Sequence, residues 1–128
     1  MQEDRTVTFT LGDLTFEYDE EKNRKNIHDH GISFRSAARV FFDYDRIELY
    51  DEEHSEDEDR YNVIGDTSAG NMVIGSPWHR EETIDDILFV VYTERTYIEV
   101  EGKHIDIIWL ISARMATSFE RGVYYGKC

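Results

Sequence analysis

The sequence predicts an α+β fold, with two N-terminal helices packed on an antiparallel sheet of about four strands and a C-terminal helix. Helical periodicity occupies residues 19–41, strand-like alternation and apolar runs occupy residues 46–111, and a capped helical segment closes the chain. Helices gathered on one face of an antiparallel sheet are typical of this order. With 128 residues, the chain is expected to form one domain, residues 1–128, around its own core.

The N-terminal segment is expected to form a β-hairpin. Its apolar residues alternate on both sides of a Gly12-Asp13 pair, at Val7, Phe9, Leu11, Leu14, Phe16 and Tyr18. Alternation with a period of two around a Gly-Asp pair is typical of two strands joined by a tight turn.

Two helices are expected after the hairpin. Asp19 is a candidate N-cap for a helix that ends at His30, with Gly31 as its C-terminal stop. Ser33 caps a second helix, whose apolar residues follow helical spacing at Phe34, Ala37, Ala38 and Phe41. This spacing buries one face of the second helix and leaves Arg35 and Arg39 together on another face.

The strands are expected in the second half of the chain. Residues 46–50 alternate between apolar and polar or aromatic side chains, and Tyr61, Val63 and their neighbours form a second run that ends at Gly65. In the first run, Ile47 and Leu49 alternate with Arg46, Glu48 and Tyr50. The runs Ile87–Tyr92 and Ile105–Ile111 are almost entirely apolar, which indicates central strands covered on both faces.

The connections between these elements carry their own signals. A turn is expected at Glu101-Gly102-Lys103, and a helix over residues 117–125 closes the chain. Residues 76–86 contain the only proline, which indicates an excursion or a short helix between two strands.

Composition excludes several classes of protein. The single cysteine, Cys128, excludes an internal disulfide, and no Cys/His pattern has the spacing of zinc ligands. The longest uncharged apolar run, Ile107–Ala113, is far shorter than the ~20 residues of a membrane span. The polar, acidic N-terminus does not have the pattern of a signal peptide. We therefore expect a soluble, cytoplasmic protein that does not associate with membranes.

Charge is unevenly distributed along the chain. The formal net charge is −14, and residues 51–59 hold seven acidic residues and no lysine or arginine. Such a run is ordinarily a solvated loop. Basic residues cluster earlier in the chain, at Lys22, Arg24, Lys25, Arg35, Arg39 and Arg46. Because electrostatic fields depend on local arrangement, an acidic chain can still contain a positive cleft.

Four segments, in order along the chain, resemble the motifs of one family. The first is Phe16-Glu17-Tyr18-Asp19-x-x-Lys22-x-x-x-Asn26-x-x-x-His30-Gly31-Ile32-x-Phe34-x-x-Ala37. The second is Asp51-x-x-His54-Ser55-Glu56-x-Glu58-x-Arg60-Tyr61, followed by Ile64-Gly65. The last two are Thr93-Glu94-Arg95 and Ile111-Ser112-Ala113-Arg114-x-Ala116-Thr117. Together they resemble the BrnT family, the toxins of bacterial and archaeal type II toxin–antitoxin pairs.

This resemblance implies a fold, an activity and partners. It implies a RelE-like fold and a metal-independent endoribonuclease, without a cofactor, that inhibits translation by cleaving RNA, free or as ribosome-associated mRNA. It also implies a cognate BrnA-like antitoxin with a ribbon-helix-helix part, through which alone the toxin reaches DNA at its own operon. Relative to the compact family form, the chain has an extra N-terminal strand at residues 6–14 and an insertion at about residues 71–86.

Cleavage of RNA through the 2′-hydroxyl group next to the scissile phosphate needs three kinds of group. A base removes the hydroxyl proton, an acid protonates the leaving 5′ oxygen, and fixed cations stabilise the extra negative charge on phosphorus. Arginine suits the last role because its planar fork matches phosphate oxygens. Histidine suits acid–base work because its ordinary pKa is about 6.5.

Five residues are candidates for catalytic groups. Arg60 either contacts phosphate or forms a salt bridge with the acids just before it. Arg95 and Arg114 end the two central strands, where we expect them to share a cleft, unless Arg114 instead holds the closing helix in place. Glu94 either acts as a base or holds an arginine. His30 either takes part in acid–base chemistry or satisfies the C-terminus of its helix.

Three further residues are candidates for binding RNA. Lys22 contacts phosphate or belongs to a solvated helix face, and Tyr61 stacks on a base or belongs to the sheet. His54 lies among carboxylates, which favour its protonated form. No metal site is expected, because His28 and His30 are two positions apart and do not share a helix face.

Departures from the family pattern leave a second function open. Asp29 stands where the family usually has lysine, and the C-terminal segment, basic in the family, here offers only Arg121 and Lys127. Because non-specific RNA affinity comes mainly from neutralised phosphates, an acidic chain should bind naked RNA weakly. The alternative is a catalytically inactive acidic interaction module on the same fold, which binds a basic partner and acts in operon regulation.

Overall fold

A computed structural model describes residues 5–68 and 86–126 of the chain. In chain order, its elements are β1 (Thr6–Leu11), β2 (Leu14–Asp19), α1 (Glu20–His30), α2 (Phe34–Ala37), η1 (Ala38–Phe42), β3 (Ile47–Tyr50), η2 (Glu52–His54), β4 (Tyr61–Asp66), β5 (Ile87–Ile98), β6 (His104–Met115) and α4 (Ser118–Tyr124). The mixed α+β class is as predicted. Apart from Asp86, the expected insertion at about residues 71–86 lies outside the described residues.

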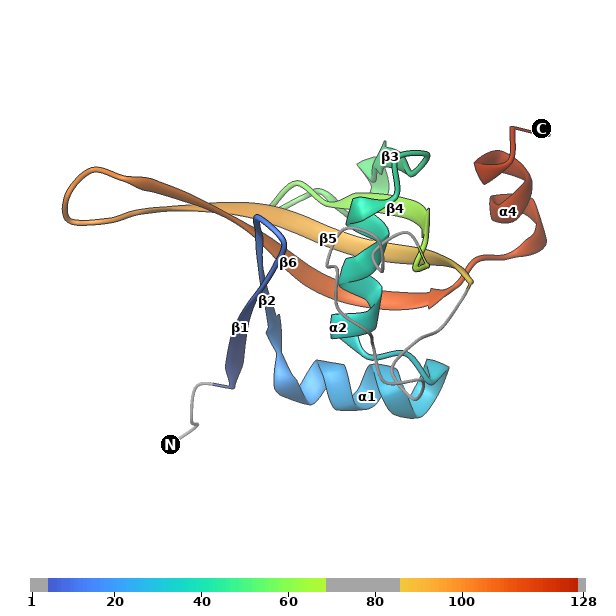
Figure 1. Cartoon of the computed structure of the whole chain (residues 1–128), viewed down its shortest axis with the longest axis horizontal. Coiled ribbons are helices and arrows are strands. Elements are labelled where there is room, and N and C mark those ends of the chain that lie inside the picture. Colours follow the sequence, from blue (N-terminus) through green and yellow to red (C-terminus); the bar gives the residue numbers. More distant parts are fainter. Residues whose placement is uncertain (1–4, 69–85, 127–128) are drawn as a thin grey trace.

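The sheet is larger than predicted and contains one parallel pair. It has six strands in the order β1-β2-β6-β5-β4-β3 (Figure 1). The N-terminal hairpin turns at residues 12–13 as expected, but it also joins the sheet, because β2 pairs in parallel with β6 through Thr15–Glu17 and Ile107–Trp109. The expectation of about four antiparallel strands is therefore wrong, because local alternation predicts a hairpin but not the distant strand that it joins.

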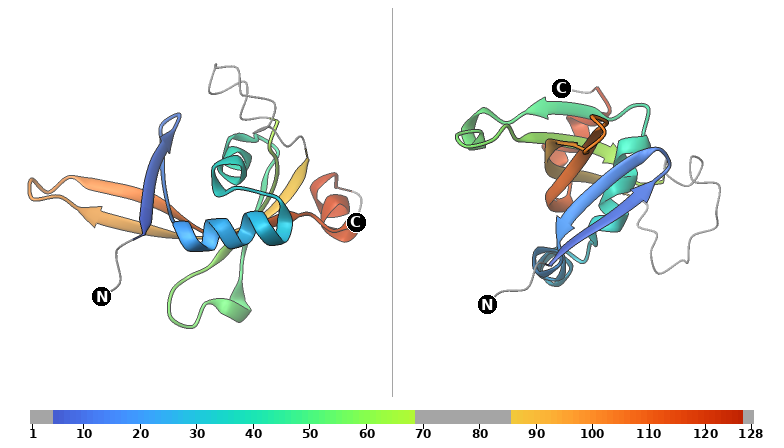
Figure 2. Two further views of the ribbon diagram at one scale, coloured as in Figure 1. Left: turned by 90° about the horizontal axis from the view of Figure 1, so that it is seen from below. Right: turned by 90° about the vertical axis from the view of Figure 1, so that its left-hand side faces the viewer.

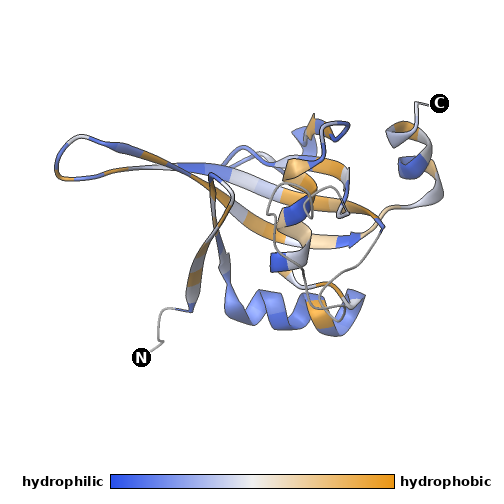
Figure 3. Cartoon of the chain, in the orientation of Figure 1, coloured by the Kyte–Doolittle hydropathy of each residue, from blue (hydrophilic) through white to orange (hydrophobic). Residues whose placement is uncertain are grey.

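Helix α1 has the predicted bounds but lies along an edge of the sheet. The side chain of Asp19 accepts a hydrogen bond from the backbone N–H of Lys22, and Gly31 ends the helix with a φ of 71°. The helix is largely hydrophilic (Figure 3) and is attached through Asn26. The amide of Asn26 donates to the carbonyl of Ala113 at 2.8 Å and accepts from the N–H of Ala113 at 3.1 Å. It thereby covers the edge of β6 beyond the part that pairs with β2.

The second predicted helix is divided into two short helices. Helix α2 passes into the 3₁₀ helix η1 at Ala38. The periodic apolar face is buried as predicted, and Arg39, expected on another face together with Arg35, is fully buried as well. A 3₁₀ helix has about 3.0 residues per turn instead of about 3.6, so residues after Ala38 are rotated from their α-helical positions. Arg35 stays exposed, and its guanidinium lies 4.5 Å above the centre of the Phe9 ring.

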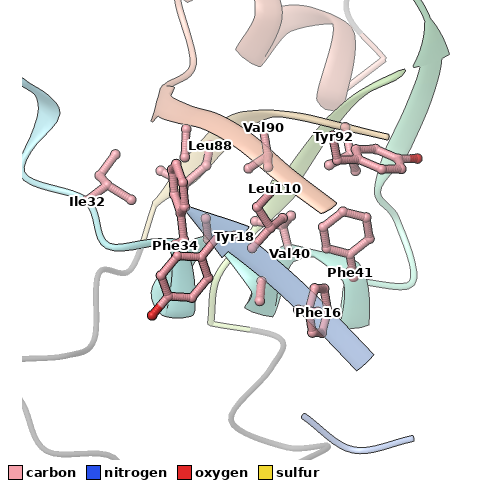
Figure 4. Close-up of a cluster of buried hydrophobic side chains, with 14 of the residues drawn as sticks. Phe16, Tyr18, Ile32, Phe34, Val40, Phe41, Leu88, Val90, Tyr92 and Leu110 are labelled. Carbon is pink, nitrogen blue, oxygen red and sulfur yellow. The ribbon is translucent and has the colours of Figure 1, made fainter. Parts of the chain in front are cut away.

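The hydrophobic core lies between α2, η1 and one face of the sheet, which we call the core face (Figures 2 and 4). Aromatic rings dominate it: Phe16 packs on Phe41 with ring centroids 5.5 Å apart, and Phe41 packs on Tyr92 at 4.9 Å. Strand β4 approaches η1 closely, since a Cβ added to Gly65 would lie 2.9 Å from Cβ of Val40. These contacts fix η1 against the middle of the sheet.

Beyond their pairing with β4 and β2, strands β5 and β6 continue as a two-stranded arm, residues 96–106 (Figure 1). Pairing between β4 and β5 ends at Tyr92, whereas β5 continues to Ile98. The turn at the tip contains Gly102 with a φ of 82°, as predicted. The core face of the arm therefore continues beyond η1.

Helix α4 lies at the other end of the β5–β6 pair (Figure 1). It begins after Thr117, as predicted, with a capping box between Thr117 and Glu120. None of its residues is buried. Its polar contacts are Glu120 with Arg114, Arg121 with Asp86, and Tyr124 with Asp43. Among the described residues, no helix has the length and apolar character needed to cross a membrane.

Candidate functional site

A groove of about 700 Å³ lies where the arm leaves the core. Its walls come from the β1–β2 turn, from the start of β3 and from the arm. Its lining includes Asp13, Arg46, Glu48, Tyr92, Glu94 and His104. Of the residues predicted for the site, the groove contains Glu94 and Arg95.

The floor of the groove is apolar. Phe41 and Tyr92 meet edge to face, and Leu14 and Ile108 complete the floor beside them. Phe41 and Tyr92 also belong to the core, so packing holds them in place (Figure 4). A flat ligand with an apolar face, such as a nucleobase, matches a floor of this kind.

Charged groups of both signs surround this floor. Basic side chains come from Arg46, Lys103 and His104, and carboxylates come from Glu48, Glu94 and Asp106. Such a mixture contrasts with the net charge of −14 for the whole chain. Cations near carboxylates are the groups that phosphate chemistry with proton transfer needs.

The hydroxyl of Tyr92 organises one end of the groove. It donates a hydrogen bond to Oε1 of Glu48 at 3.0 Å, and Nη2 of Arg46 lies 3.7 Å from Oε2 of Glu48. Burial, followed by the charge of Glu48 and the hydrogen bond to it, raises the pKa of Tyr92 far above its ordinary value. Tyr92 therefore stays protonated and holds Glu48, which in turn holds Arg46.

Arg46 combines fixed geometry with spare hydrogen-bonding capacity. Its Nη1 donates to the carbonyl of Asp43 at 3.2 Å. Its Nε is buried and has no hydrogen-bond partner within residues 5–68 and 86–126, and its side chain is 33% exposed. Asp43 and Glu48 thus hold the guanidinium in place, and the exposed third of the side chain is the part that a phosphate group can reach.

Glu94 is one of the exposed carboxylates of the groove. It lies two residues after Tyr92, so both side chains project from the core face of β5. Its carboxylate makes no hydrogen bond or ion pair with the part of the chain that the structure describes. The pKa of Tyr61 is raised by partial burial, then by the charges of Asp59 and Glu94.

Tyr61 belongs to the sheet and to a row of three rings. It is half-buried and packs against the core. Its ring stacks on Tyr92, with centroids 5.6 Å apart, and meets Tyr50 at 5.7 Å. The row leads from the groove across β4 to the edge strand β3.

The structure does not bring Arg95 and Arg114 together, so the expectation of a shared cleft is wrong. Arg95 pairs with Ile107 on β6, and Arg114 pairs with Phe89 on β5. Because the two strands are antiparallel, their C-terminal ends point in opposite directions. The stretch from Ile107 to Arg114 corresponds to roughly 20 Å along β6.

Both of these arginines have carboxylate partners. Arg95 projects from the face opposite the core face, where its guanidinium lies 4.3 Å above Trp109 and its Nη2 lies 3.4 Å from Glu58. Arg114 forms two hydrogen bonds with Glu120, at 2.7 and 2.9 Å. These hydrogen bonds raise the pKa of Arg114. Arg114 therefore ties α4 to the sheet, which was the alternative interpretation from the sequence.

Arg60 and His54 line a separate hollow of about 360 Å³ in the acidic loop. The backbone N–H of Arg60 donates to Ser55 Oγ at 2.9 Å. Its guanidinium forms no ion pair among the described residues, although acids precede it. His54 Nδ1 lies 2.9 Å from the carboxylate of Asp51. This hollow is distinct in its lining from the groove.

Lys22 and His30 lie exposed on α1 and do not line the groove. Asn26 lies four residues from both Lys22 and His30, so the sequence places the three polar side chains in a stripe on one face of the helix. The side chain of Asn26 is instead buried against β6. Because Asn26 binds Ala113, α1 lies near the α4 end of β6 rather than near the arm. The polar stripe is therefore interrupted by a structural residue.

Several groove residues were not singled out from the sequence. The alternation of Glu48 and Tyr50 with apolar residues places them on one face of β3, and Arg46 directly precedes this strand. The sequence gives no sign that this face meets Tyr92, because that contact depends on the pairing of β3 with β4 and of β4 with β5. Within residues 5–68 and 86–126, no three His, Cys, Asp or Glu side chains are grouped to hold a metal ion.

Similarity to known proteins agrees with the motifs in the sequence. No curated protein matches the chain. The family model of the ribonuclease toxin BrnT of type II toxin–antitoxin systems matches residues 18–85, more than half of the chain. The matched segment includes α1, α2, β3 and β4, and therefore Arg46 and Glu48 of the groove. The resemblance is thereby confirmed, and the chain belongs to the BrnT family of ribonuclease toxins of type II toxin–antitoxin systems.

Proposed function

We propose that this toxin is a metal-independent endoribonuclease that inhibits translation and that its chemistry takes place in the groove. The observation that carries the proposal is that one groove contains Arg46, Glu94 and the hydrogen bond from the Tyr92 hydroxyl to Glu48 in an otherwise acidic chain. A ribbon-helix-helix antitoxin of the BrnA type is the proposed partner that neutralises the enzyme and carries the complex to DNA.

Each group has a proposed role in one cleavage step. Glu94 takes the proton from the 2′-hydroxyl group, whose oxygen then attacks phosphorus. Arg46 stabilises the negative charge that develops on the phosphate oxygens. The bond from phosphorus to the 5′ oxygen breaks, and that oxygen takes a proton from water in the open groove. Tyr92 and Glu48 act as positioning residues, because they hold Arg46 without contacting RNA.

The other candidate residues from the sequence have different proposed roles. Arg60 remains a proposed phosphate contact outside the groove, because no carboxylate among the described residues pairs with its guanidinium. Lys22, His30 and His54 are proposed as surface contacts for RNA at most, since none lines the groove. Arg95 and Arg114 must release Glu58 and Glu120 before either contacts phosphate.

The decisive experiment uses the antitoxin-free chain, a long single-stranded RNA and a chelator. We expect fragments with 5′-hydroxyl and 2′,3′-cyclic phosphate ends, and a loss of about 10²–10⁴-fold in rate with Glu94→Gln. Glu99→Gln is the matched control, because Glu99 is an exposed acid near the arm tip outside the groove lining. Wild-type rates for Glu94→Gln contradict the role of Glu94, and activity that the chelator abolishes contradicts metal independence.

A second measurement tests the biological part of the proposal. Added to a cell-free translation system, the wild-type chain is expected to stop protein synthesis, and the cognate antitoxin is expected to restore it. Glu94→Gln should leave synthesis running at the same concentration. Arrest of synthesis by Glu94→Gln as well would mean that translation stops for a reason other than cleavage in the groove.

One observation favours the alternative of an inactive, acidic interaction module. Two of the predicted catalytic arginines, Arg95 and Arg114, are already paired with carboxylates. In that case the wild-type chain leaves RNA intact with and without a chelator, yet binds a basic partner in a salt-dependent way. Intact RNA in both conditions would therefore favour the interaction module.

A further inference from the structure

We propose that Tyr50 and Tyr61 form a base-stacking subsite at the β3 end of the groove, and that this subsite prefers a nucleobase with an exocyclic amino group. The inference rests on the proposed ribonuclease function and adds a substrate preference to it. Its ligand is an unpaired nucleotide of single-stranded RNA next to the nucleotide that reacts.

The first argument is the exposure and fixed position of the Tyr50 ring. Tyr50 ends β3, which is an edge strand of the described sheet, and is 52% exposed. Its hydroxyl donates to Oδ1 of Asp59 at 3.1 Å, and its ring meets Tyr61 at an interplanar angle of 65°. An aromatic ring that is held at its edge and tip, with much of its surface open, is pre-organised for stacking.

The second argument is continuity with the groove. Tyr50, Tyr61 and Tyr92 occupy directly opposed positions on β3, β4 and β5. Neighbouring strands lie about 4.8 Å apart, so the row brings Tyr50 within about 10 Å of the strand that carries Tyr92 and Glu94. An RNA strand whose phosphate lies at Arg46 therefore reaches Tyr50 with an adjacent base.

The third argument is the sign of the surrounding charge. Tyr50 is followed by the acidic loop, and Asp59 and Glu94 both lie close enough to Tyr61 to raise its pKa. Carboxylates repel phosphates but accept hydrogen bonds from amino groups on base edges. Adenine, cytosine and guanine carry such a group, whereas uracil does not. Stacking on the tyrosine ring therefore attracts the nucleobase to this subsite, and the carboxylates make the subsite prefer a base with an amino group.

The test uses short single-stranded 2′-deoxy oligonucleotides, which bind without being cleaved because the attacking hydroxyl is absent. Oligo-deoxycytidine and oligo-deoxyuridine are a matched pair, since their bases differ in an amino group against a carbonyl. We expect several-fold tighter binding of the cytidine oligomer, measured by fluorescence anisotropy. Equal binding of the two oligomers overturns the amino-group preference.

Variants of two tyrosines test the stacking itself. Tyr50→Ala should weaken binding of both oligomers by about tenfold, the size expected for one lost stacking contact, and Tyr50→Phe should retain it. Tyr44→Ala is the matched control, because Tyr44 is 95% exposed and lies outside the row. Circular dichroism confirms that each variant is folded. Equal affinities for Tyr50→Ala and Tyr44→Ala overturn the subsite.

Cleavage assays separate this proposal from the one on which it rests. With an RNA substrate, Tyr50→Ala should raise KM and leave kcat near the wild-type value, whereas Glu94→Gln should lower kcat. If the wild type cleaves RNA and Tyr50→Ala changes neither binding nor KM, the subsite is wrong and the ribonuclease stands. If the wild type neither cleaves nor binds RNA, both proposals are wrong.

Discussion

The two ends of the β5–β6 pair use charged side chains in different ways. At the α4 end, Arg114 is bound on both sides of its fork by Glu120 and stacks above Phe89 at 4.2 Å. At the arm end, Glu94 makes no hydrogen bond or ion pair with the described residues, and Nε of Arg46 is buried without such a partner among them. At the α4 end the carboxylate of Glu120 meets Arg114 through two short hydrogen bonds, whereas at the arm end Arg46 meets Glu48 only at 3.7 Å and Glu94 makes no such contact among the described residues.

This difference separates structural arginines from those available to a ligand. A guanidinium whose donors already meet a carboxylate contributes to holding two elements together, and RNA must displace that carboxylate before binding. Buried donors without partners lower stability, so they persist where a function requires them. The groove is therefore a better site for phosphate chemistry than the α4 end, where Arg114 lies above the Phe89 ring and meets Glu120 through two hydrogen bonds.

The largest expected difference in this comparison is between the single variants Arg46→Ala and Arg114→Ala. Arg46→Ala should reduce the rate of RNA cleavage by about 10²–10³-fold, the usual loss when one donor to a developing oxyanion is removed. Arg114→Ala should leave cleavage nearly unchanged and lower the midpoint of urea unfolding instead. Kinetics and unfolding of both variants are measured side by side. A large loss of activity in Arg114→Ala, with Arg46→Ala active, would reverse the comparison.

The next effect concerns the attachment of α1 at the α4 end. Asn26→Ala removes the partner of both backbone groups of Ala113 and of the carbonyl of Ile32. Unsatisfied buried groups should lower the free energy of unfolding by roughly 3 kcal/mol. Lys22→Ala, an exposed change on the same helix, should stay within about 0.5 kcal/mol of the wild type. Similar urea midpoints for the two variants would mean that the amide of Asn26 does not hold α1 to β6.

A smaller effect is expected where β4 meets η1. The Cβ added by Gly65→Ala lies 2.9 Å from Cβ of Val40 and 3.1 Å from its carbonyl oxygen. Since backbone cannot move aside as a flexible side chain does, this overpacking should cost about 2 kcal/mol in the free energy of unfolding. The added Cβ also lies 3.4 Å from Cβ of Arg46, which lines the groove, so cleavage by the folded variant is measured beside its unfolding. An unchanged urea midpoint would show that η1 shifts freely against the sheet.

Local elements were predictable because their signals lie within a few residues. The cap at Asp19, the stop at Gly31 and the turn at Gly102 all follow from side chains next to the backbone they govern. The parallel pairing of β2 with β6 joins segments about ninety residues apart, and no local pattern encodes it. The same limit misplaced Arg95 and Arg114, because two strand ends are close in space only when the strand directions allow it.

The groove shows that local sequence patterns also fail to predict which residues of a candidate site meet. Alternation over residues 46–50 grouped Arg46 with Glu48, and the motif in β5 singled out Glu94. Only the order of the strands shows that these carboxylates line one groove with Tyr92. Residue types and spacing thus predicted some of the members, and tertiary pairing determined which of them meet.

The smallest predicted effect depends on pH and concerns the pair of Arg114 and Glu120 at the α4 end. The hydrogen bond from Arg114, opposed by partial burial, lowers the pKa of Glu120. A carboxyl whose folded pKa is lowered stabilises the protein fully above its ordinary pKa of about 4.3, and this contribution disappears as pH falls through the lowered value. Glu120→Gln should therefore cost about 1 kcal/mol at neutral pH and progressively less in acid. Urea unfolding of Glu120→Gln and wild type across this range measures the difference, with Glu99→Gln as the control that shows no such trend. A cost that persists unchanged in acid would mean that Glu120 stabilises α4 through its cap hydrogen bonds rather than through the charge of Arg114.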